Sequence, residues 1–173
     1  RVLKEDGPEL AKTLYDRIGR TTHRFVLAED NDAAYADVDD VTGDYVLEEY
    51  QTAYESGTSD DVLMSVRIDR LHADWGGGST TGALDTNADA DALLLTATNL
   101  AGRPQITCAW YDRFGRATDA VQYGDYAGAN FDRDGLSLPS RSDTALVTSY
   151  AYGTDGEVLS TTDPRALVAR TEN

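Results

Sequence analysis

Several stretches of the chain alternate strictly between apolar and polar residues, which is the pattern of half-buried β-strands. Residues 62–69 read Val-Leu-Met-Ser-Val-Arg-Ile-Asp, so every second position from 62 to 68 is apolar. The same alternation places Ile106, Cys108 and Trp110 on one face of another stretch, and residues 146–152 and 158–162 continue it. These stretches predict β-strands that each bury one face.

The ends of these stretches carry a repeated turn signature. A tyrosine stands four positions before a glycine at three places, in the pairs Tyr15 and Gly19, Tyr111 and Gly115, and Tyr152 and Gly156. Asp16 and Asp112 suit the first position of a type I turn, and a glycine three positions later suits its last. Each glycine is expected in the left-handed conformation that closes a hairpin with a bulge. A looser copy begins at Tyr54, where Glu55 replaces the aspartate and Gly57 comes one position early.

Together these patterns predict an all-β protein. We expect one unit over residues 1–173, built from about four successive antiparallel β-hairpins in an extended, curved or spiralling sheet. Three stretches lack alternation and are predicted to be long, outward-facing loops, at about 29–49, 74–91 and 124–143. Loops of this length inside a compact domain often have a function.

The charge balance excludes several partners. The chain has 31 acidic and 15 basic residues, a formal charge of -16 and an isoelectric point of about 4.2. Long-range repulsion therefore opposes unaided binding to nucleic acid or to an anionic membrane. The longest apolar runs are too short to span a bilayer, so membrane insertion is not expected.

Catalytic motifs are not recognisable, so we predict that the protein is not an enzyme. The only histidines, His23 and His72, lie beside no nucleophile motif, and the single cysteine, Cys108, sits in an apolar strand face. The glycines at 76–78 lack the lysine of a phosphate-binding loop. A glycosidase is a third hypothesis only because carboxylates are plentiful.

Calcium binding by the acidic loops is the alternative hypothesis. Calcium needs six to eight oxygen ligands, which closely spaced aspartates can supply. The candidate ligands are Asp37, Asp39, Asp40 and Asp44 in the first loop and Asp85, Asn87 and Asp89 in the second. The second group has the spacing that opens an EF-hand, but Ala90 and Thr96 replace the required glycine and glutamate. An EF-hand is therefore excluded, and this alternative describes a calcium-dependent adhesion or ligand-binding module.

The turn units resemble the YD repeats of bacterial Rhs proteins and of the related teneurins. Tyr15, Asp16, Gly19 and Arg20 form one Tyr-Asp-x-x-Gly-Arg unit, and residues 111–116 form a second. Tyr152, Gly156 and the run 163–165 match a further repeat, in which Ala166 stands where the family's Asp-Pro-x-Gly element has glycine. The resemblance implies that successive hairpins join side by side into the wall of a shell, and that the tyrosine of each hairpin bonds to the next.

The leading hypothesis follows from this resemblance. It describes a non-catalytic structural segment of a secreted or cell-surface protein that forms a shell, stalk or filament wall and needs no cofactor. Because the chain starts at Arg1 rather than Met, we expect a segment of a longer chain. Its expected partners are adjacent repeats of that chain, or further copies that pair along the edge strands.

Overall fold

The computed structural model of the chain describes residues 2–5, 10–29, 40–55, 59–71, 81–86, 94–96, 100–125, 130–166 and 168–170. These residues form strands and turns, with no helix among them, so the predicted all-β class is confirmed. Consequently, no helix in these ranges could cross a membrane. The strands are β1 (Val2–Glu5), β2 (Leu10–Tyr15), β3 (Thr21–Glu29), β4 (Tyr45–Tyr54), β5 (Val62–Arg70), β6 (Leu94–Leu95), β7 (Gly102–Tyr111), β8 (Ala117–Asp125), β9 (Phe131–Asp132), β10 (Leu146–Tyr152), β11 (Val158–Thr162) and β12 (Val168–Arg170).

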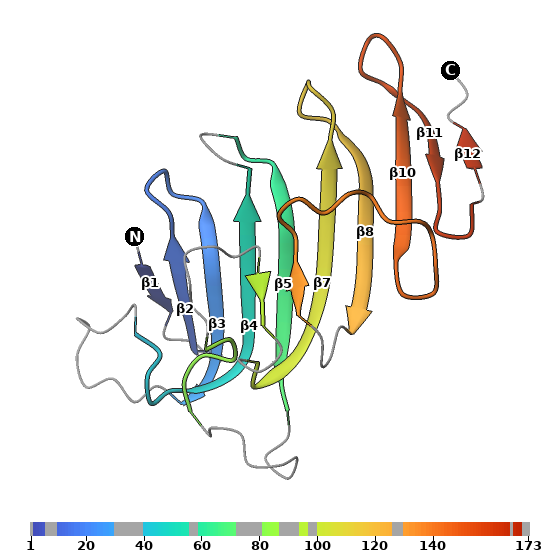
Figure 1. Cartoon of the computed structure of the whole chain (residues 1–173). Helices are drawn as coiled ribbons and strands as arrows, with labels where there is room; N and C mark the ends of the chain where they lie inside the picture. The colour runs from blue at the N-terminus through green and yellow to red at the C-terminus, as the bar shows by residue number, and fades with distance from the viewer. Residues whose placement is uncertain are drawn as a thin grey trace.

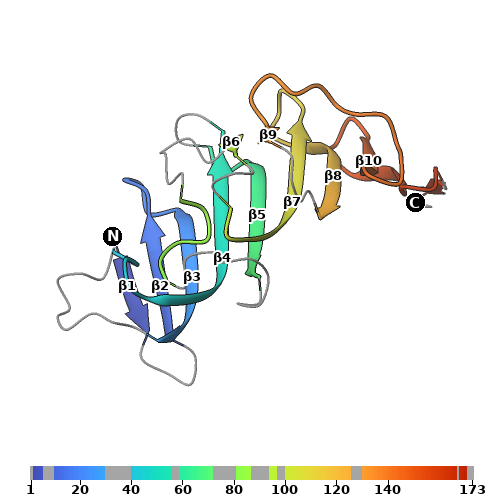
Figure 2. The same ribbon diagram turned by 60° about the horizontal axis from the view of Figure 1, so that its bottom comes forward.

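Ten of these strands form one open antiparallel sheet. Its order is β1-β2-β3-β4-β5-β7-β8-β10-β11-β12, so the chain crosses the sheet without a reversal of order. Four tight hairpins dominate it: hairpin 1 (β2 and β3), hairpin 2 (β4 and β5), hairpin 3 (β7 and β8) and hairpin 4 (β10 and β11). The chain's two ends lie at opposite edges of the sheet, as Figures 1 and 2 show.

The hairpin turns have the geometry that the glycine spacing predicts. Gly19, Gly115 and Gly156 have φ angles of 92°, 75° and 88°, in the left-handed region that favours glycine. In each hairpin the strand register shifts next to the tyrosine that precedes the turn, which is the expected bulge. The sequence therefore predicted these four chain reversals correctly.

One face of the sheet is covered and contains the main core. Met64, Val66 and Ile68 of β5 point to this face and pair with Cys108, Ile106 and Pro104 of β7. The insertions add Leu84, Leu95 and Phe131, which are all buried in the same cluster. The period-two pattern therefore identified the buried face, while the residues that cover it come from the connections.

The strands that lead into the three long connections, β3, β5 and β8, end at the side of the sheet opposite the tight turns (Figure 1). The first connection ends earlier than the sequence pattern indicates, because β4 already begins at Tyr45. The second contains β6 and the third contains β9, and these two short strands pair with each other. The connections thus supply a small second layer over the covered face.

Candidate functional site

The Tyr-Asp-x-x-Gly-Arg unit builds a hydrogen-bonded turn. In hairpin 3, Asp112 Oδ1 accepts hydrogen bonds from the backbone N–H groups of Phe114 (2.8 Å) and Arg116 (3.1 Å). Asp112 Oδ2 accepts one from Arg116 Nε at 2.8 Å, and this side chain lowers the pKa of the Asp112 carboxyl. The aspartate therefore fixes both the turn backbone and the arginine.

Hairpin 1 repeats this geometry. Asp16 Oδ1 accepts from the N–H groups of Ile18 (3.0 Å) and Arg20 (2.9 Å), and Asp16 Oδ2 accepts from Arg20 Nε (2.7 Å). Two turns nearly a hundred residues apart thus hold their arginines in the same way. The shared spacing therefore encodes one local structure.

The tyrosines link neighbouring hairpins. The Tyr54 hydroxyl donates to the main-chain oxygen of Thr21 at 3.0 Å, the Tyr111 hydroxyl to that of Val62 at 2.9 Å, and the Tyr152 hydroxyl to that of Ala117 at 2.7 Å. Each acceptor lies at the start of the second strand of the preceding hairpin. The expectation that each tyrosine bonds to the next hairpin is therefore wrong in direction, because the hydroxyl reaches back along the chain order.

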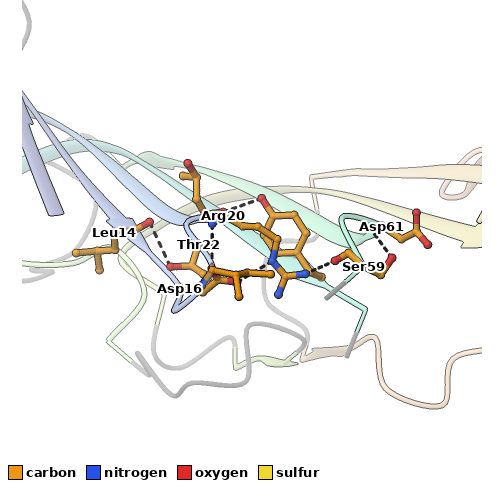
Figure 3. A network of polar contacts seen from close by, with 9 residues as sticks. Leu14, Asp16, Arg20, Thr22, Ser59 and Asp61 are labelled. Atoms are coloured by element: carbon orange, nitrogen blue, oxygen red, sulfur yellow. Dashed lines mark hydrogen bonds and ion pairs between the residues drawn. The ribbon is translucent and has the colours of Figure 1, made fainter. Parts of the chain in front are cut away.

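The arginines make the reciprocal link forward. Arg20 lies 4.3 Å from the ring centre of Tyr54, and its Nη1 donates to the Ser59 oxygen (Figure 3). Arg116 lies 4.7 Å from the ring centre of Tyr152, and its Nη1 donates to an oxygen of the next turn at 3.4 Å. Cation–π contacts of this kind add to the tyrosine hydrogen bonds. Hairpins 1 and 2, and hairpins 3 and 4, are therefore joined in both directions.

The hairpins that depart from the motif still close their turns with main-chain hydrogen bonds, and the bond in hairpin 4 has the same spacing as those that Asp16 N and Asp112 N make in hairpins 1 and 3. In hairpin 2, Glu55 N donates to the Asp61 oxygen at 2.8 Å. In hairpin 4, Gly153 N donates to the Glu157 oxygen at 2.8 Å. Beyond it, the turn between β11 and β12 puts Ala166 at a φ of 63°, a conformation that costs an alanine about 1–2 kcal/mol. The main-chain reversal therefore survives loss of the aspartate, while the arginine link does not.

Four of the seven candidate calcium ligands, Asp37, Asp39, Asn87 and Asp89, lie outside the described residues. Asp40 Oδ1 accepts from Thr42 N at 2.7 Å. Asp44 is fully buried and pairs with the buried ammonium of Lys12 at 2.7 Å. Within the described ranges, no three acidic, histidine or cysteine side chains group in an arrangement that could hold a metal.

Asp44 and Asp85 also differ from the expectation that the acidic loops face outward. Their exposed fractions are 0% and 2%. Asp85 Oδ2 accepts from Gln51 Nε2 at 3.1 Å, and Lys12 Nζ also donates to the main-chain oxygen of Asp40 at 2.6 Å. These aspartates therefore attach the first two insertions to the sheet.

A buried polar cluster on the covered face was missed by sequence reasoning. Glu49 Oε2 accepts from the N–H groups of Leu84 (2.7 Å) and Asp85 (3.0 Å), and Glu49 Oε1 accepts from Gln51 Nε2 (2.9 Å). Burial raises the pKa of the Glu49 carboxyl despite these donors. The available signal was Lys12, one of only two lysines, between the apolar residues Leu10 and Leu14. A polar residue at an inward position of an alternating strand indicates a buried partner.

Of the cysteine, the histidines and the glycine run that were considered for catalysis, the structure describes only Cys108 and His23. Cys108 is buried, as the alternation predicts, and this burial raises the pKa of its thiol to about 11. Its thiolate is therefore not populated at neutral pH. His23 lies on the covered face, while His72 and the glycines at 76–78 lie outside the described residues.

No protein-family model and no curated protein sequence matches the chain.

Proposed function

We propose that the chain is a non-catalytic structural segment of a YD-repeat protein of the Rhs type, placed at the cell surface or outside the cell. In this proposal its hairpins form part of a wall whose other hairpins come from the same longer polypeptide or from further copies. The observation that carries the proposal is the repeated contact of a tyrosine hydroxyl with the preceding hairpin. A contact repeated at each junction can continue the sheet indefinitely in one direction.

The first tyrosine of the series supports continuation beyond hairpin 1. Tyr15 occupies the position equivalent to Tyr111 and Tyr152, at the strand end before the turn. Its hydroxyl has no hydrogen-bond partner among the residues that the structure describes, whereas the equivalent tyrosines each bond to a preceding hairpin. We infer that β1 is the second strand of a preceding hairpin and that Tyr15 bonds in the same way to a main-chain oxygen where that strand begins.

The edge strands support the same proposal. β1 and β12 each pair with one neighbour, so each presents one unpaired backbone edge in the described structure. Such edges recruit further strands unless charge, proline or a covering segment prevents it. A wall formed by edge pairing would use both of them.

Electron cryo-microscopy of the complete polypeptide that contains this segment tests the proposal. We expect an additional antiparallel strand beside β1 and another beside β12, and a Tyr15 hydroxyl within hydrogen-bond distance of a main-chain oxygen. A structure in which both edges face solvent would contradict the proposal.

Matched variants extend the test to solution. In the chain alone, Tyr15→Phe should leave the free energy of unfolding unchanged, whereas Tyr152→Phe should lower it by about 1 kcal/mol. In the complete polypeptide both variants should lower the free energy of unfolding by the same amount. An unchanged Tyr15→Phe variant in both settings would show that no preceding hairpin binds this tyrosine.

A further inference from the structure

A cavity of about 550 Å³ lies between the covered face of the sheet and the first two insertions. Its floor comes from β2, β3 and β4, and its walls come from residues 40–43 and 81–86. This volume lies within the range of pockets that hold small organic molecules. The lining residues are Leu14, His23, Phe25, Asp40, Val41, Thr42, Gly43, Glu49, Thr81, Gly82, Ala83 and Thr86.

The floor combines apolar surface with an imidazole that lacks a partner. His23 stacks on Phe25, with ring centres 6.1 Å apart and planes 12° apart, and Leu14 is its register neighbour on β2. Neither imidazole nitrogen of His23 has a hydrogen-bond partner in the described part of the chain. Burial lowers the pKa of His23 and so favours the neutral ring, which offers one donor and one acceptor.

Among the described residues that line the cavity, the two with carboxyl groups are Asp40 and Glu49. Glu49 is 1% exposed, and among the described residues its Oε1 accepts a hydrogen bond from Gln51 alone, which leaves this oxygen a second acceptor position. Asp40 stands in the wall, and the charge of buried Asp85 acts on His23. No lysine or arginine is among the lining residues, and the nearby Lys12 ammonium pairs with Asp44.

We propose that this cavity binds a small organic cation, with an amidinium, guanidinium or primary ammonium group on a short apolar body. The cationic group bonds to Glu49 Oε1 and the His23 ring, and the apolar body contacts Leu14, Phe25 and Val41. An anionic ligand would meet Asp40 and Glu49, while the nearby Lys12 ammonium is already paired with Asp44. The proposal is independent of sheet assembly, because the cavity lies within hairpins 1 and 2 and their insertions.

Three probes of the same shape and different charge test the ligand class. Benzamidinium, benzamide and benzoate are titrated into the whole chain, and the imidazole signals of its two histidines are followed by NMR, with His23→Leu used to assign them. We expect benzamidinium to shift the His23 signals with saturation in the millimolar range. Benzamide should bind at least about tenfold more weakly, since it lacks the charge-assisted hydrogen bond, and benzoate should leave the signals unchanged.

Two variants locate the binding. Thr86→Trp, in the exposed part of the wall, should abolish the benzamidinium shifts by filling the entrance, while Thr52→Val, on the opposite face of β4, should leave them unchanged. Thr86→Trp also serves if His23→Leu fails to fold. Absence of saturable His23 shifts with benzamidinium, equal shifts with benzoate, or full binding by Thr86→Trp would each overturn the proposal. None of these results would affect the edge pairing of β1 and β12.

Discussion

Two junctions between neighbouring hairpins are held together by different means. At the junction of hairpins 2 and 3, β5 pairs with β7 from Met64 to Arg70, and the facing side chains belong to the large core that the insertions cover. At the junction of hairpins 3 and 4, β8 pairs with β10 only from Leu146 to Ser149, over a core of three buried residues. The second junction has the Arg116–Tyr152 contact, and the first has no arginine at the equivalent place.

The difference shows two ways to join the same repeat. Where an insertion covers the sheet, apolar burial stabilises the junction, and one tyrosine hydrogen bond sets its alignment. Where the cover is thin, polar and cation–π contacts at the turn end contribute a larger share. The Tyr-Asp-x-x-Gly-Arg motif of hairpin 3 is therefore most important for holding hairpin 4, because the core at their junction is small.

The largest effect is expected from the same core truncation at both junctions. Val66→Ala removes a fully covered side chain at the β5–β7 junction and should cost about 2–3 kcal/mol, from lost burial and the cavity that remains. Val147→Ala at the β8–β10 junction should cost about 1–2 kcal/mol, because the thin core can collapse around it. Urea unfolding of both variants measures the difference. Equal costs would mean that the two cores are equivalent.

A smaller effect is expected from the turn that lies between the two junctions. Gly115→Val places a β-branched residue at a φ of 75° and should lower the free energy of unfolding by about 1–3 kcal/mol. Gly115→Asn is the matched control, because asparagine tolerates this conformation, and it should cost well under half as much. Thermal unfolding of the two variants measures both costs. If valine and asparagine destabilise equally, backbone strain is not the cause.

The smallest effect concerns the tyrosine links. Tyr111→Phe and Tyr152→Phe each leave a main-chain oxygen without its hydroxyl donor and should each cost about 0.5–1.5 kcal/mol. Combining Arg116→Gln with Tyr152→Leu should reveal a coupling of about 0.5–1 kcal/mol, whereas Arg116→Gln with Tyr111→Leu should show almost none. Double-mutant cycles by urea unfolding measure both values. If Arg116 coupled equally to Tyr111 and to Tyr152, the arginine contact would not distinguish the junction of hairpins 3 and 4.

The sequence predicted the hairpins because their information is local. A tyrosine, an aspartate and a glycine within five positions specify the turn, the bulge and the left-handed residue, and period-two alternation specifies the buried face. The direction of the tyrosine bond was not predictable in this way, since its acceptor belongs to a hairpin 33 to 49 residues away along the chain. The expectation correctly made the tyrosine the residue that links neighbouring hairpins, but it named the following hairpin as the partner instead of the preceding one.

The buried polar cluster shows the limit most clearly. Lys12 stands at an inward position of an alternating strand, but Asp44, Glu49 and Asp85 read as ordinary charged residues, and the two aspartates read as parts of solvated acidic loops. Their burial follows from where the insertions return to the sheet, as when Leu84 N reaches Glu49. Spacing along the chain contains no information about such a return.

The amino-acid sequence alone determined the strand periodicity, the positions of the chain reversals and the antiparallel succession of hairpins, because each depends on residues within a few positions of one another. Tertiary structure decided which acids are buried, how neighbouring hairpins are linked and where the cavity lies. Those features require segments distant in the chain to be brought together, and the free energy that does so comes from the whole packed sheet and its insertions.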